Sequence, residues 1–326
     1  MRAVLIQEPG GPEALRPGEV PDPAPSPGEI LVRVRATALN RADLLQRRGL
    51  YPPPPGVHPR IPGLEFAGSV EAAGPAVTEF QPGQRVMGLL PGAGYAEKVV
   101  TPERLALPIP DRLSFQEAAG IPEVFLTAFD ALHLQGGLGP GHTLLLHGAG
   151  SGVGTAALQL CRLSRATSIG TSRSRPKLDR CRELGLDHAL LTERGEFREA
   201  VLELTGGRGV DLVLDMVGAP YLEQNLSCLA PRGRLILIGL LGGPSAPIDL
   251  SRILKQSLRI RGTVLRPRPV EEKIRLNQEF RRRILPFFEN GVLTPIIDRE
   301  FPLEEAAEAH SFMESNGNFG KIVLIC

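Results

Sequence analysis

Glycines are concentrated in one short stretch, where an apolar run is followed by a helical pattern. The stretch reads Thr143-Leu-Leu-Leu-His-Gly-Ala-Gly-Ser-Gly-Val-Gly154. Small residues let a ligand approach the backbone, and the first turn of a helix offers unpaired N–H groups and a partial positive charge. In the register of the G-x-G-x-x-G motif, Ala149 and Ser151 replace the first two glycines. We expect this turn to hold the pyrophosphate of a dinucleotide; an ordinary strand–helix turn is the alternative.

The predicted backbone contacts of that pyrophosphate are Ala149, Gly150, Ser151, Gly152 and Val153. The Ser151 hydroxyl is an additional candidate for a bond to a phosphate oxygen. His147 lies in the same turn, and we expect it to have a structural role rather than to act as a base.

A basic segment follows the next apolar run. NAD sites usually carry an acid about 20 residues after the glycine motif, bonded to the ribose hydroxyls. Here the segment reads Thr171-Ser-Arg-Ser-Arg-Pro-Lys177, with three cations and no acid. A 2′-phosphate binds charge-assisted donors of this kind, and a carboxylate would repel it. The segment therefore favours NADPH over NADH; a solvated helix start is the alternative.

Two sequence patterns, one on each side of residue 120, indicate the secondary-structure elements that position these residues. Residues 1–120 read as short strands between Pro/Gly turns, which is typical of a small, partly closed barrel. Beyond residue 120, apolar runs alternate with amphipathic stretches, which indicates a parallel sheet covered on both faces. The expected strands are Ala3–Gln7, Glu29–Ala38, Ala67–Ala73, Arg85–Leu89, Ala96–Val100, Thr143–Leu146, Ser168–Thr171, His188–Leu191, Asp211–Asp215, Leu235–Gly239, Leu258–Gly262 and Gly320–Ile325. Helices are expected at Asn40–Arg48, Lys177–Leu184, Phe197–Leu204 and Val270–Asn290.

Composition excludes several classes of protein. Of the 326 residues, 42% are hydrophobic and 22% are charged, with a formal net charge of +1, so no electrostatic argument for nucleic acid or an acidic membrane follows. Four cysteines lie far apart without a CxxC pair, which argues against a disulfide framework and a cysteine zinc site. With no signal-peptide pattern or long apolar run, we expect a cytoplasmic protein.

Six motifs give the chain a resemblance to a known family. They read Asn40-Arg-Ala-Asp-Leu44, Arg48-Gly-Leu-Tyr-Pro-Pro-Pro-Pro-Gly56, Pro62-Gly-Leu-Glu-Phe-Ala-Gly68, Gly94-Tyr-Ala-Glu97, Ser151-Gly-Val-Gly-Thr-Ala-Ala157 and Asn318-Phe-Gly-Lys-Ile-Val323. Over essentially its whole length the chain resembles the zinc-free quinone oxidoreductases, the zeta-crystallin-like branch of the medium-chain dehydrogenase/reductase superfamily.

The resemblance implies an α/β fold with two domains. A GroES-like, partly open β-barrel domain would comprise residues 1–120 and 290–326 and bind the substrate. A Rossmann domain with a doubly wound parallel sheet would comprise residues 121–289, with NADPH in the cleft between the two. The resemblance also implies a homodimer or tetramer formed through the edge strand 258–262.

Zinc relatives hold a catalytic metal with Cys, His and Cys, and a Glu lies beside the His. At the corresponding places this chain has Asn40, Leu64 and Glu123, while Glu65 remains. One amide, one apolar residue and one carboxylate do not make a tetrahedral zinc site. We therefore expect no metal, and an alcohol dehydrogenase that relies on zinc as a Lewis acid is disfavoured.

The resemblance carries cofactor contacts onto further positions. Ser174 and Lys177 correspond to 2′-phosphate contacts, and Asn318 to a contact on the nicotinamide side. Thr192 stands where relatives often have a Tyr that packs on the phosphate end, so the arginines would contribute more here. Backbone near the nicotinamide ribose and amide corresponds to Val217, Leu240, Leu241, Val264 and Leu265.

Three residues are candidates for the acceptor site. Tyr51 precedes the rigid Pro52–Pro55 run, so its ring could stack on a flat quinone or bond its oxygen; a surface aromatic is the alternative. Asn40 could bond the acceptor carbonyl or only cap a helix. Thr127 is expected to face the nicotinamide or to pack within its helix. We find no Ser/His/Asp or paired-carboxylate signature, and hydride transfer from a nicotinamide to an electron-poor quinone needs none.

Three functions remain open. The first is an NADPH-dependent quinone reductase. The second is an NADPH-dependent enone or alkenal double-bond reductase, which needs a proton on the carbon next to the hydride. The third is a non-enzymatic NADPH-binding protein with a structural or RNA-binding role, although the chain lacks a basic–aromatic patch.

Overall fold

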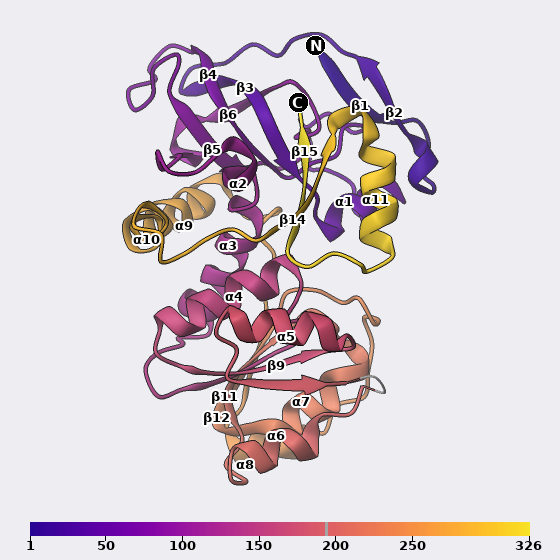
Figure 1. The fold of residues 1–326 in the computed structure, drawn as a ribbon, viewed down its shortest axis with the longest axis vertical. Helices are drawn as coiled ribbons and strands as arrows, with labels where there is room; N and C mark the ends of the chain where they lie inside the picture. Colours follow the sequence, from indigo (N-terminus) through magenta and orange to yellow (C-terminus); the bar gives the residue numbers. More distant parts are fainter. Residues whose placement is uncertain (193–194) are drawn as a thin grey trace. The chain divides into compact units, whose positions relative to one another are not determined.

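The computed structural model describes residues 1–192 and 195–326, and the contacts within it divide the chain into two units (Figure 1). The first unit comprises Met1–Leu126 and Leu265–Cys326, and the second comprises Thr127–Val264. The expected boundaries at residues 120 and 290 therefore shift, because residues 121–126 and 265–289 belong to the first unit.

The second unit contains one parallel sheet of six strands. In space their order is β10-β9-β8-β11-β12-β13. The first strand along the chain therefore lies in the middle, and the order reverses between β8 and β11. This is the doubly wound order of a Rossmann sheet, as expected from the sequence. The strands are β8 (Thr143–Leu146), β9 (Thr167–Ser172), β10 (His188–Leu191), β11 (Val210–Asp215), β12 (Leu229–Leu237) and β13 (Arg259–Gly262).

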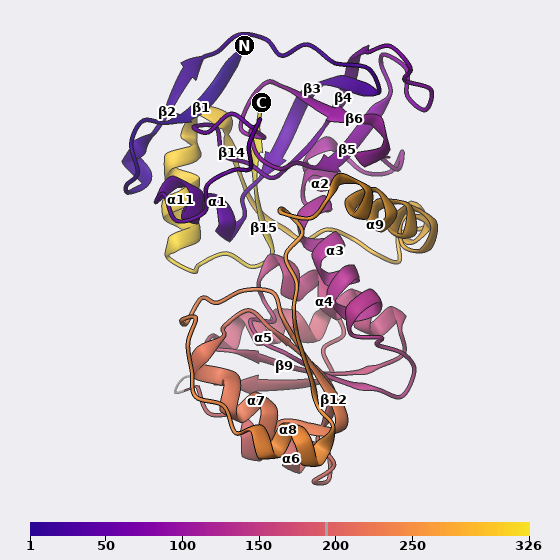
Figure 2. The ribbon, with the colours of Figure 1, turned by 180° about the vertical axis from the view of Figure 1, so that it is seen from behind.

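Helices cover both faces of this sheet (Figures 1 and 2). On one face lie α4 (Gly152–Leu163) and α5 (Arg175–Glu183). On the other lie α6 (Arg198–Leu204), α7 (Leu222–Cys228) and α8 (Leu250–Gln256). Burial on both faces explains the apolar runs of the two central strands, β8 and β11. Ala156 and Ala157 are buried on α4, which lets that helix pack closely on the sheet.

The first unit is built on a sheet of seven strands in which the last strand is internal. The order is β14-β15-β3-β4-β5-β7, and β6 pairs with β3. β15 thus lies between β14 and β3, which confirms that the C-terminal strand rejoins the first domain. A ribbon of β1 (Arg2–Ile6) and β2 (Leu15–Glu19) adjoins it. The sheet strands are β3 (Glu29–Ala38), β4 (Glu65–Ala73), β5 (Arg85–Leu89), β6 (Lys98–Pro102), β7 (Ala106–Pro108), β14 (Ile297–Pro302) and β15 (Lys321–Ile325).

The single helix expected over Val270–Asn290 is two helices. They are α9 (Val270–Arg283) and α10 (Leu285–Glu289), and the break falls at Ile284, just before Pro286. Proline has no N–H to donate and its ring clashes with the preceding turn, so α9 cannot continue through it. The amide of Asn277 on α9 donates to the carbonyls of Arg104 (3.1 Å) and Ala106 (3.3 Å), which fastens α9 to the segment that leads into β7.

Four further helices among the described residues bear on the site. α1 (Arg41–Arg47) begins after Asn40, as the sequence predicts, and α2 (Phe115–Ala119) begins with a capping box of Ser114 and Glu117. α3 (Pro122–Phe129) continues into a π-helical turn, and α11 (Ala306–Glu314) precedes β15. Within the described ranges, no helix has the length and apolar character needed to cross a membrane.

Candidate functional site

The turn between β8 and α4 has the geometry of an anion-binding helix start. Ser151 is the N-cap of α4, and its hydroxyl oxygen accepts a bond from the N–H of Gly154 at 3.0 Å. The hydroxyl also points to the sulfur of Met216 at 3.6 Å, which is a weak acceptor. The N–H groups of Gly152 and Val153 lie in the first helical turn and have no intrahelical acceptor. The turn thus offers two backbone donors and the positive end of the helix dipole.

Two glycines in this turn are required by its geometry. Gly148 has a φ of +63°, which L side chains rarely adopt. A Cβ on Gly154 would lie 2.4 Å from the carbonyl oxygens of both Gly148 and Ala149. The third glycine of the motif therefore allows the helix to start this close to the strand.

A buried polar network lies beneath the turn. The Nε2 of His147 donates to the Asn225 amide oxygen (2.7 Å), whose NH₂ donates to Asp215 (3.0 Å). The Nδ1 of His147 accepts from the Thr171 hydroxyl at 2.9 Å. Asp215 also accepts the N–H groups of Val217 (2.6 Å) and Gly218. The network therefore joins the turn after β8, the end of β9, the loop after β11 and helix α7.

Burial sets the protonation states in this network. Desolvation lowers the pKa of His147 to about 4, against a smaller opposing effect of its bond to Asn225. Desolvation raises the pKa of Asp215 to about 6, while its bonds from Val217 and Gly218 act in the opposite direction. His147 is neutral at physiological pH with both ring nitrogens hydrogen-bonded, so it holds the turn in place rather than acting as a base.

The basic segment after β9 has the donors that a 2′-phosphate needs. Ser174 precedes α5, and its hydroxyl makes no capping bond to that helix. Its N–H donates to the Ser172 hydroxyl at 3.1 Å. Arg173 and Arg175 are exposed and Lys177 is partly exposed, so their charges are accessible to an anion.

Thr192 lies behind this segment. It is 2% exposed, and both its N–H (2.9 Å) and its hydroxyl (3.4 Å) bond to the carbonyl of Ser172. Thr192 thus bonds to the end of β9, two residues before Ser174, and a contact between Thr192 and the cofactor stays a prediction.

The loops after β11 and β12 bond to one another at the same edge of the sheet. The N–H groups of Leu241 and Gly242 donate to the carbonyls of Met216 (3.1 Å) and Val217 (2.7 Å). Leu240 and Leu241 expose about half of their surface or more, at 51% and 59%. The carboxyl ends of β8, β9, β11 and β12 therefore converge where open parallel sheets bind dinucleotides.

The remaining predicted cofactor residues differ in accessibility. Val264 is exposed, whereas Leu265 is buried. Of these two residues, only Val264 has a side chain that is accessible to a cofactor. Asn318 is buried in the first unit, and its amide donates to the Gly320 carbonyl at 2.8 Å. Thr127 is partly exposed on α3, and its role toward the nicotinamide stays a prediction.

In the first unit, a lysine ammonium occupies the centre of a buried polar cluster. The Lys321 Nζ donates to the Leu39 carbonyl (2.7 Å), the Asn40 amide oxygen (2.6 Å) and Glu65 (2.8 Å). Asn40 donates to Glu65 at 2.8 Å, and the other Glu65 oxygen accepts the N–H of Glu123 at 2.8 Å. The Asn40 amide is thus fully engaged within the cluster, which disfavours the expected bond from Asn40 to an acceptor carbonyl.

The residues of this cluster do not fit a zinc ion. Leu64 offers no donor, the Asn40 oxygen is bonded to Lys321, and an ammonium at this position would repel a second cation. Among the residues that the structure describes, no group of three or more His, Cys, Asp or Glu side chains is placed to hold a metal.

Glu123 is the titratable group of this cluster that remains partly exposed. Burial, and next the charge of Glu65, raise the pKa of its carboxyl to about 8, with a smaller opposing effect of Lys321. At neutral pH it is therefore mostly protonated and can donate a hydrogen bond or a proton. The sequence shows only a carboxylate at this position; its environment is set by Glu65, 58 residues away in the chain.

Tyr51 is half-buried beside a buried arginine that the sequence analysis did not single out. The Arg266 guanidinium carbon lies 4.6 Å from the centroid of the Tyr51 ring, and its Nη1 donates to the Tyr51 carbonyl at 3.1 Å. Burial raises the pKa of Tyr51, and the Arg266 charge acts in the opposite direction. The Tyr51 residue is therefore held both by the rigid proline run that follows it and by Arg266.

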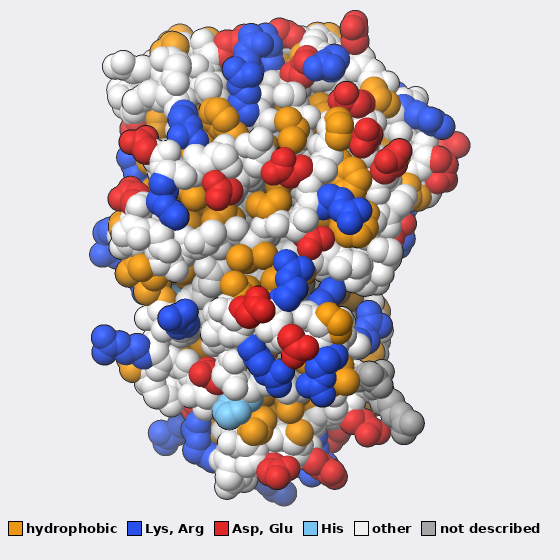
Figure 3. Space-filling view, viewed as in Figure 1, with side chains coloured by type: hydrophobic (Ala, Val, Ile, Leu, Met, Phe, Trp, Pro, Cys, Tyr) orange, Lys and Arg blue, Asp and Glu red, His pale blue; other side chains and the backbone are white. Residues whose placement is uncertain are grey.

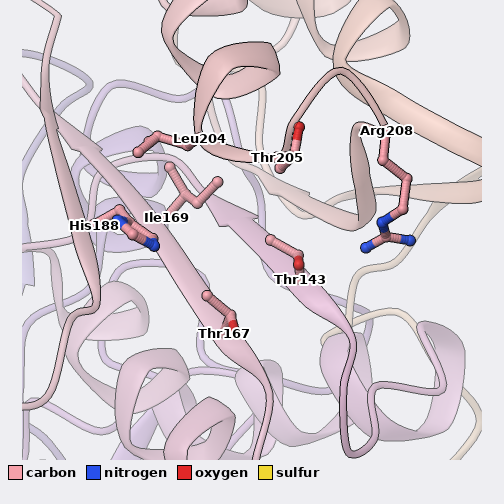
Figure 4. Close-up of a pocket in the computed structure, with 7 residues that line it drawn as sticks. All are labelled: Thr143, Thr167, Ile169, His188, Leu204, Thr205 and Arg208. Carbon is pink, nitrogen blue, oxygen red and sulfur yellow. The ribbon is translucent and has the colours of Figure 1, made fainter.

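A separate cavity of about 250 Å³ lies at the opposite end of the parallel sheet (Figure 4). Thr143, Thr167 and His188, the first residues of β8, β9 and β10, line it together with Arg208. Arg208 makes a bidentate ion pair with Asp211 at 2.8–2.9 Å. Because dinucleotides bind at the carboxyl ends of such strands, this cavity is not the cofactor site.

On the face of the molecule shown in Figure 3, surface charge gives no indication of a polyanionic partner. On the face shown in Figure 3, basic and acidic side chains are interspersed on both units. This agrees with the net charge of +1 and does not favour RNA binding.

Comparisons with known proteins identify the family. Residues 26–111 match the alcohol dehydrogenase GroES-like domain, and residues 152–280 match the zinc-binding dehydrogenase family. The chain is 34% identical to a 2-haloacrylate reductase of Burkholderia sp, covering 99% of this chain and 98% of the relative. It is 32% identical to the quinone oxidoreductase of Lama guanicoe, covering 100% and 97%.

Solved structures agree with this assignment. The fold matches a quinone oxidoreductase of Escherichia coli complexed with NADPH, with a TM-score of 0.90, 28% identity and full coverage of both chains. It matches an NAD-dependent alcohol dehydrogenase equally well, with a TM-score of 0.90 and 35% identity over the whole of both chains. The protein is therefore an oxidoreductase with a nicotinamide cofactor site, and the chain belongs to the zinc-free quinone oxidoreductase branch of the medium-chain dehydrogenase/reductase superfamily.

Proposed function

We propose that this protein is an NADPH-dependent, metal-free quinone oxidoreductase. The observation that carries the proposal is the acid-free segment Arg173–Lys177 beside the helix start at Ser151, which together present donors for a 2′-phosphate and a pyrophosphate. The names of the quinone oxidoreductase relatives support a quinone as the acceptor.

The chemistry requires positioning more than side-chain catalysis. When bound, NADPH supplies a hydride, that is, two electrons and one proton, and the acceptor takes a further proton from water. The chain's part is to hold the pyrophosphate with Gly152 and Val153 and the 2′-phosphate with Ser174 and Lys177. Tyr51 would orient the acceptor, by stacking on a flat ring or by a hydrogen bond to its oxygen.

The residues around Lys321 limit the range of acceptors. Asn40 and Glu65 bind an ammonium rather than a metal ion, so the chain itself provides no Lewis acid at that position. Such a site suits an acceptor that is already electron-poor, as a quinone is, and is unsuited to the oxidation of a simple alcohol.

A second candidate function is the reduction of an enone or alkenal double bond. The partly exposed Glu123 carboxyl favours it, since a raised pKa of about 8 keeps a proton available at neutral pH. Hydride would add to one carbon of the double bond, and the proton to its neighbour. The name of the 2-haloacrylate reductase relative is consistent with this class of acceptor.

A panel of quinones and enones, followed by the absorbance of NADPH and of NADH at 340 nm, tests these proposals. Turnover of quinones with NADPH is the expected result. Turnover of enones alone would favour the second function. Tight NADPH binding without turnover of either class would favour a non-enzymatic role, and a tight preference for NADH would contradict the cofactor assignment.

Tyr51→Phe and Tyr51→Ala measure the part played by Tyr51. We expect Tyr51→Ala to lower kcat/KM for several quinones by at least about tenfold, because both stacking and the hydroxyl are lost. Tyr51→Phe separates the two contributions, since it keeps the ring. Unchanged kcat/KM in both variants would remove Tyr51 from the site.

A further inference from the structure

Arg266 is a buried cation for which the proposed reaction gives no direct use. It follows Leu265, where the chain re-enters the first unit, and it is only 8% exposed. It lies outside the helices and strands, in a turn in which the N–H of Arg268 donates to the Leu265 carbonyl. A guanidinium in such a position costs free energy unless its donors are satisfied and its charge is used.

Its donors are satisfied by neutral groups from three segments. Nε donates to the Pro91 carbonyl (2.7 Å), Nη1 to the Tyr51 carbonyl (3.1 Å) and Nη2 to the Gln46 side-chain oxygen (2.7 Å). Gly92 leaves room for it, because a Cβ there would lie 3.3 Å from Nη2 and 2.8 Å from Val57. Arg266 therefore ties α1, the segment after Tyr51 and the Pro91–Gly92 loop together.

Its charge is directed at Tyr51. The guanidinium lies over the Tyr51 ring at 4.6 Å, and across the described residues no carboxylate is within ion-pair distance of it. Asp43 of α1 and Glu123 of α3 act on it only from farther away. The group that most directly experiences this positive charge is thus the Tyr51 phenol.

We propose that Arg266 is a positioning residue for Tyr51, which fixes the ring and holds a positive charge against it so that the phenol O–H donates a stronger hydrogen bond to the acceptor oxygen. This inference rests on the proposed function, because negative charge develops on that oxygen as the hydride arrives. The phenol keeps its proton throughout, and the proton that completes the reduction comes from water. A donor aimed at developing charge lowers the barrier without any reorganisation during the reaction.

The phenol can be observed without turnover. The chain has three tyrosines and no tryptophan, so tyrosinate absorbance at 295 nm is not obscured. Burial places the pKa of Tyr95 well above its ordinary value, and subtracting the titration of Tyr51→Phe isolates Tyr51. Arg266→Gln should move the Tyr51 titration upward by about one unit, as expected for loss of a nearby opposite charge. Arg266→Lys keeps a charge and should move it less.

Kinetics provide the second measurement. In the wild-type background, Arg266→Gln should lower kcat for a quinone by roughly 10- to 100-fold. In the Tyr51→Phe background it should lower kcat by less than about threefold, because the phenol hydrogen bond that Arg266 strengthens is already absent there. The Kd for NADPH should stay unchanged. The control is Arg104→Gln, which removes an exposed arginine paired with Glu271 and should leave both measurements unchanged.

Two results would overturn the inference: an unmoved Tyr51 titration in folded Arg266→Gln, as judged by circular dichroism, or equal losses of kcat in both backgrounds. Should Arg266→Gln not fold, the same criteria apply to Arg266→Lys, whose titration must then still differ measurably from that of the wild type. A wild-type protein that turns over no acceptor but shows the titration shift would refute the proposed function and support the link between Arg266 and Tyr51.

Discussion

Replacing Gly154 by Ala sets two effects of opposite sign against each other. Gly154 lies in the first turn of α4, where alanine is the better helix former by about 0.5–1 kcal/mol. Propensity alone therefore predicts a more stable protein. The added methyl group, however, would lie 2.4 Å from two backbone oxygens, those of Gly148 and Ala149.

The steric effect should prevail, because those oxygens cannot move freely. The Ala149 N–H is bonded to the Thr171 carbonyl (3.0 Å), so relieving the clash means moving the turn away from β9. Overpacking of this kind costs about 1–3 kcal/mol. After the gain in propensity, we expect a net loss of up to about 2.5 kcal/mol, or a fall in Tm of up to roughly 10 °C.

The same movement should weaken cofactor binding. The N–H groups of Gly152 and Val153 would shift from their positions, and we expect the Kd for NADPH to rise by at least about tenfold. Calorimetry and titration of NADPH fluorescence measure the two effects.

Gly139→Ala is the matched control for this substitution. A Cβ at Gly139 would meet no atom within 4 Å, so we expect its unfolding free energy to stay within about 0.5 kcal/mol of the wild type. If Gly154→Ala matched Gly139→Ala in both Tm and Kd, the argument that the turn is packed too closely for a side chain would be refuted.

Three further predictions concern cofactor choice, pH and assembly. Ser174→Asp places a carboxylate beside the 2′-phosphate and should raise the Kd for NADPH by at least about tenfold while sparing NADH; equal changes for both cofactors would argue against the assigned phosphate site. Glu123, with a pKa of about 8 in the folded protein, keeps a proton that the unfolded chain loses near its ordinary pKa of 4.5. Its contribution to stability is thus complete below about pH 4.5 and is lost as the pH rises to about 8, by up to about 1.4 kcal/mol per unit. The Tm of Glu123→Gln should therefore rise relative to that of the wild type as the pH increases from 5 to 9. Glu8→Gln is the control and should show no such relative rise. A difference in Tm between Glu123→Gln and the wild type that is constant with pH would contradict this prediction. Strand β13 has an exposed edge and an exposed Ile260, so we expect a homo-oligomer by light scattering that Ile260→Arg disrupts and Val292→Arg does not; a monomeric wild type would exclude this interface.

The sequence predicted the second unit well because its signals are local. The strands Thr143–Leu146 and His188–Leu191 are found as predicted. The first of them, β8, is an apolar run at the centre of the sheet and is almost wholly buried, as expected for a strand covered on both faces. The position of Ser151 at the start of α4 follows from the same local pattern. The helical pattern over Val270–Asn290 predicts one helix, but Pro286 within it ends α9, and a second helix follows.

The parts of the site that the sequence did not predict depend on contacts between distant residues. Nothing near Lys321 indicates that its ammonium bonds to Asn40 and Glu65, more than 250 residues earlier. Arg266 directly precedes Pro267 in a proline-containing, charged stretch that resembles a solvated loop, and only the fold brings it to Tyr51. Thr192 stands where relatives often have a Tyr, and the sequence does not indicate that its hydroxyl bonds to the Ser172 carbonyl. The type of side chain indicated what chemistry is possible at these positions, but it did not indicate which residue each side chain contacts.

The internal position of β15 has a consequence for the order in which the molecule is made. A ribosome releases residues 1–126 long before Lys321–Ile325, so β3 must wait for the neighbour that fills the place between it and β14. Until then Glu65 and the Leu39 carbonyl lack the ammonium that bonds to both. The second unit, by contrast, has all six strands in one continuous stretch and can condense during synthesis. The nascent chain would therefore carry a formed nucleotide domain attached to an incomplete barrel, and the barrel would close only after translation of the last strand.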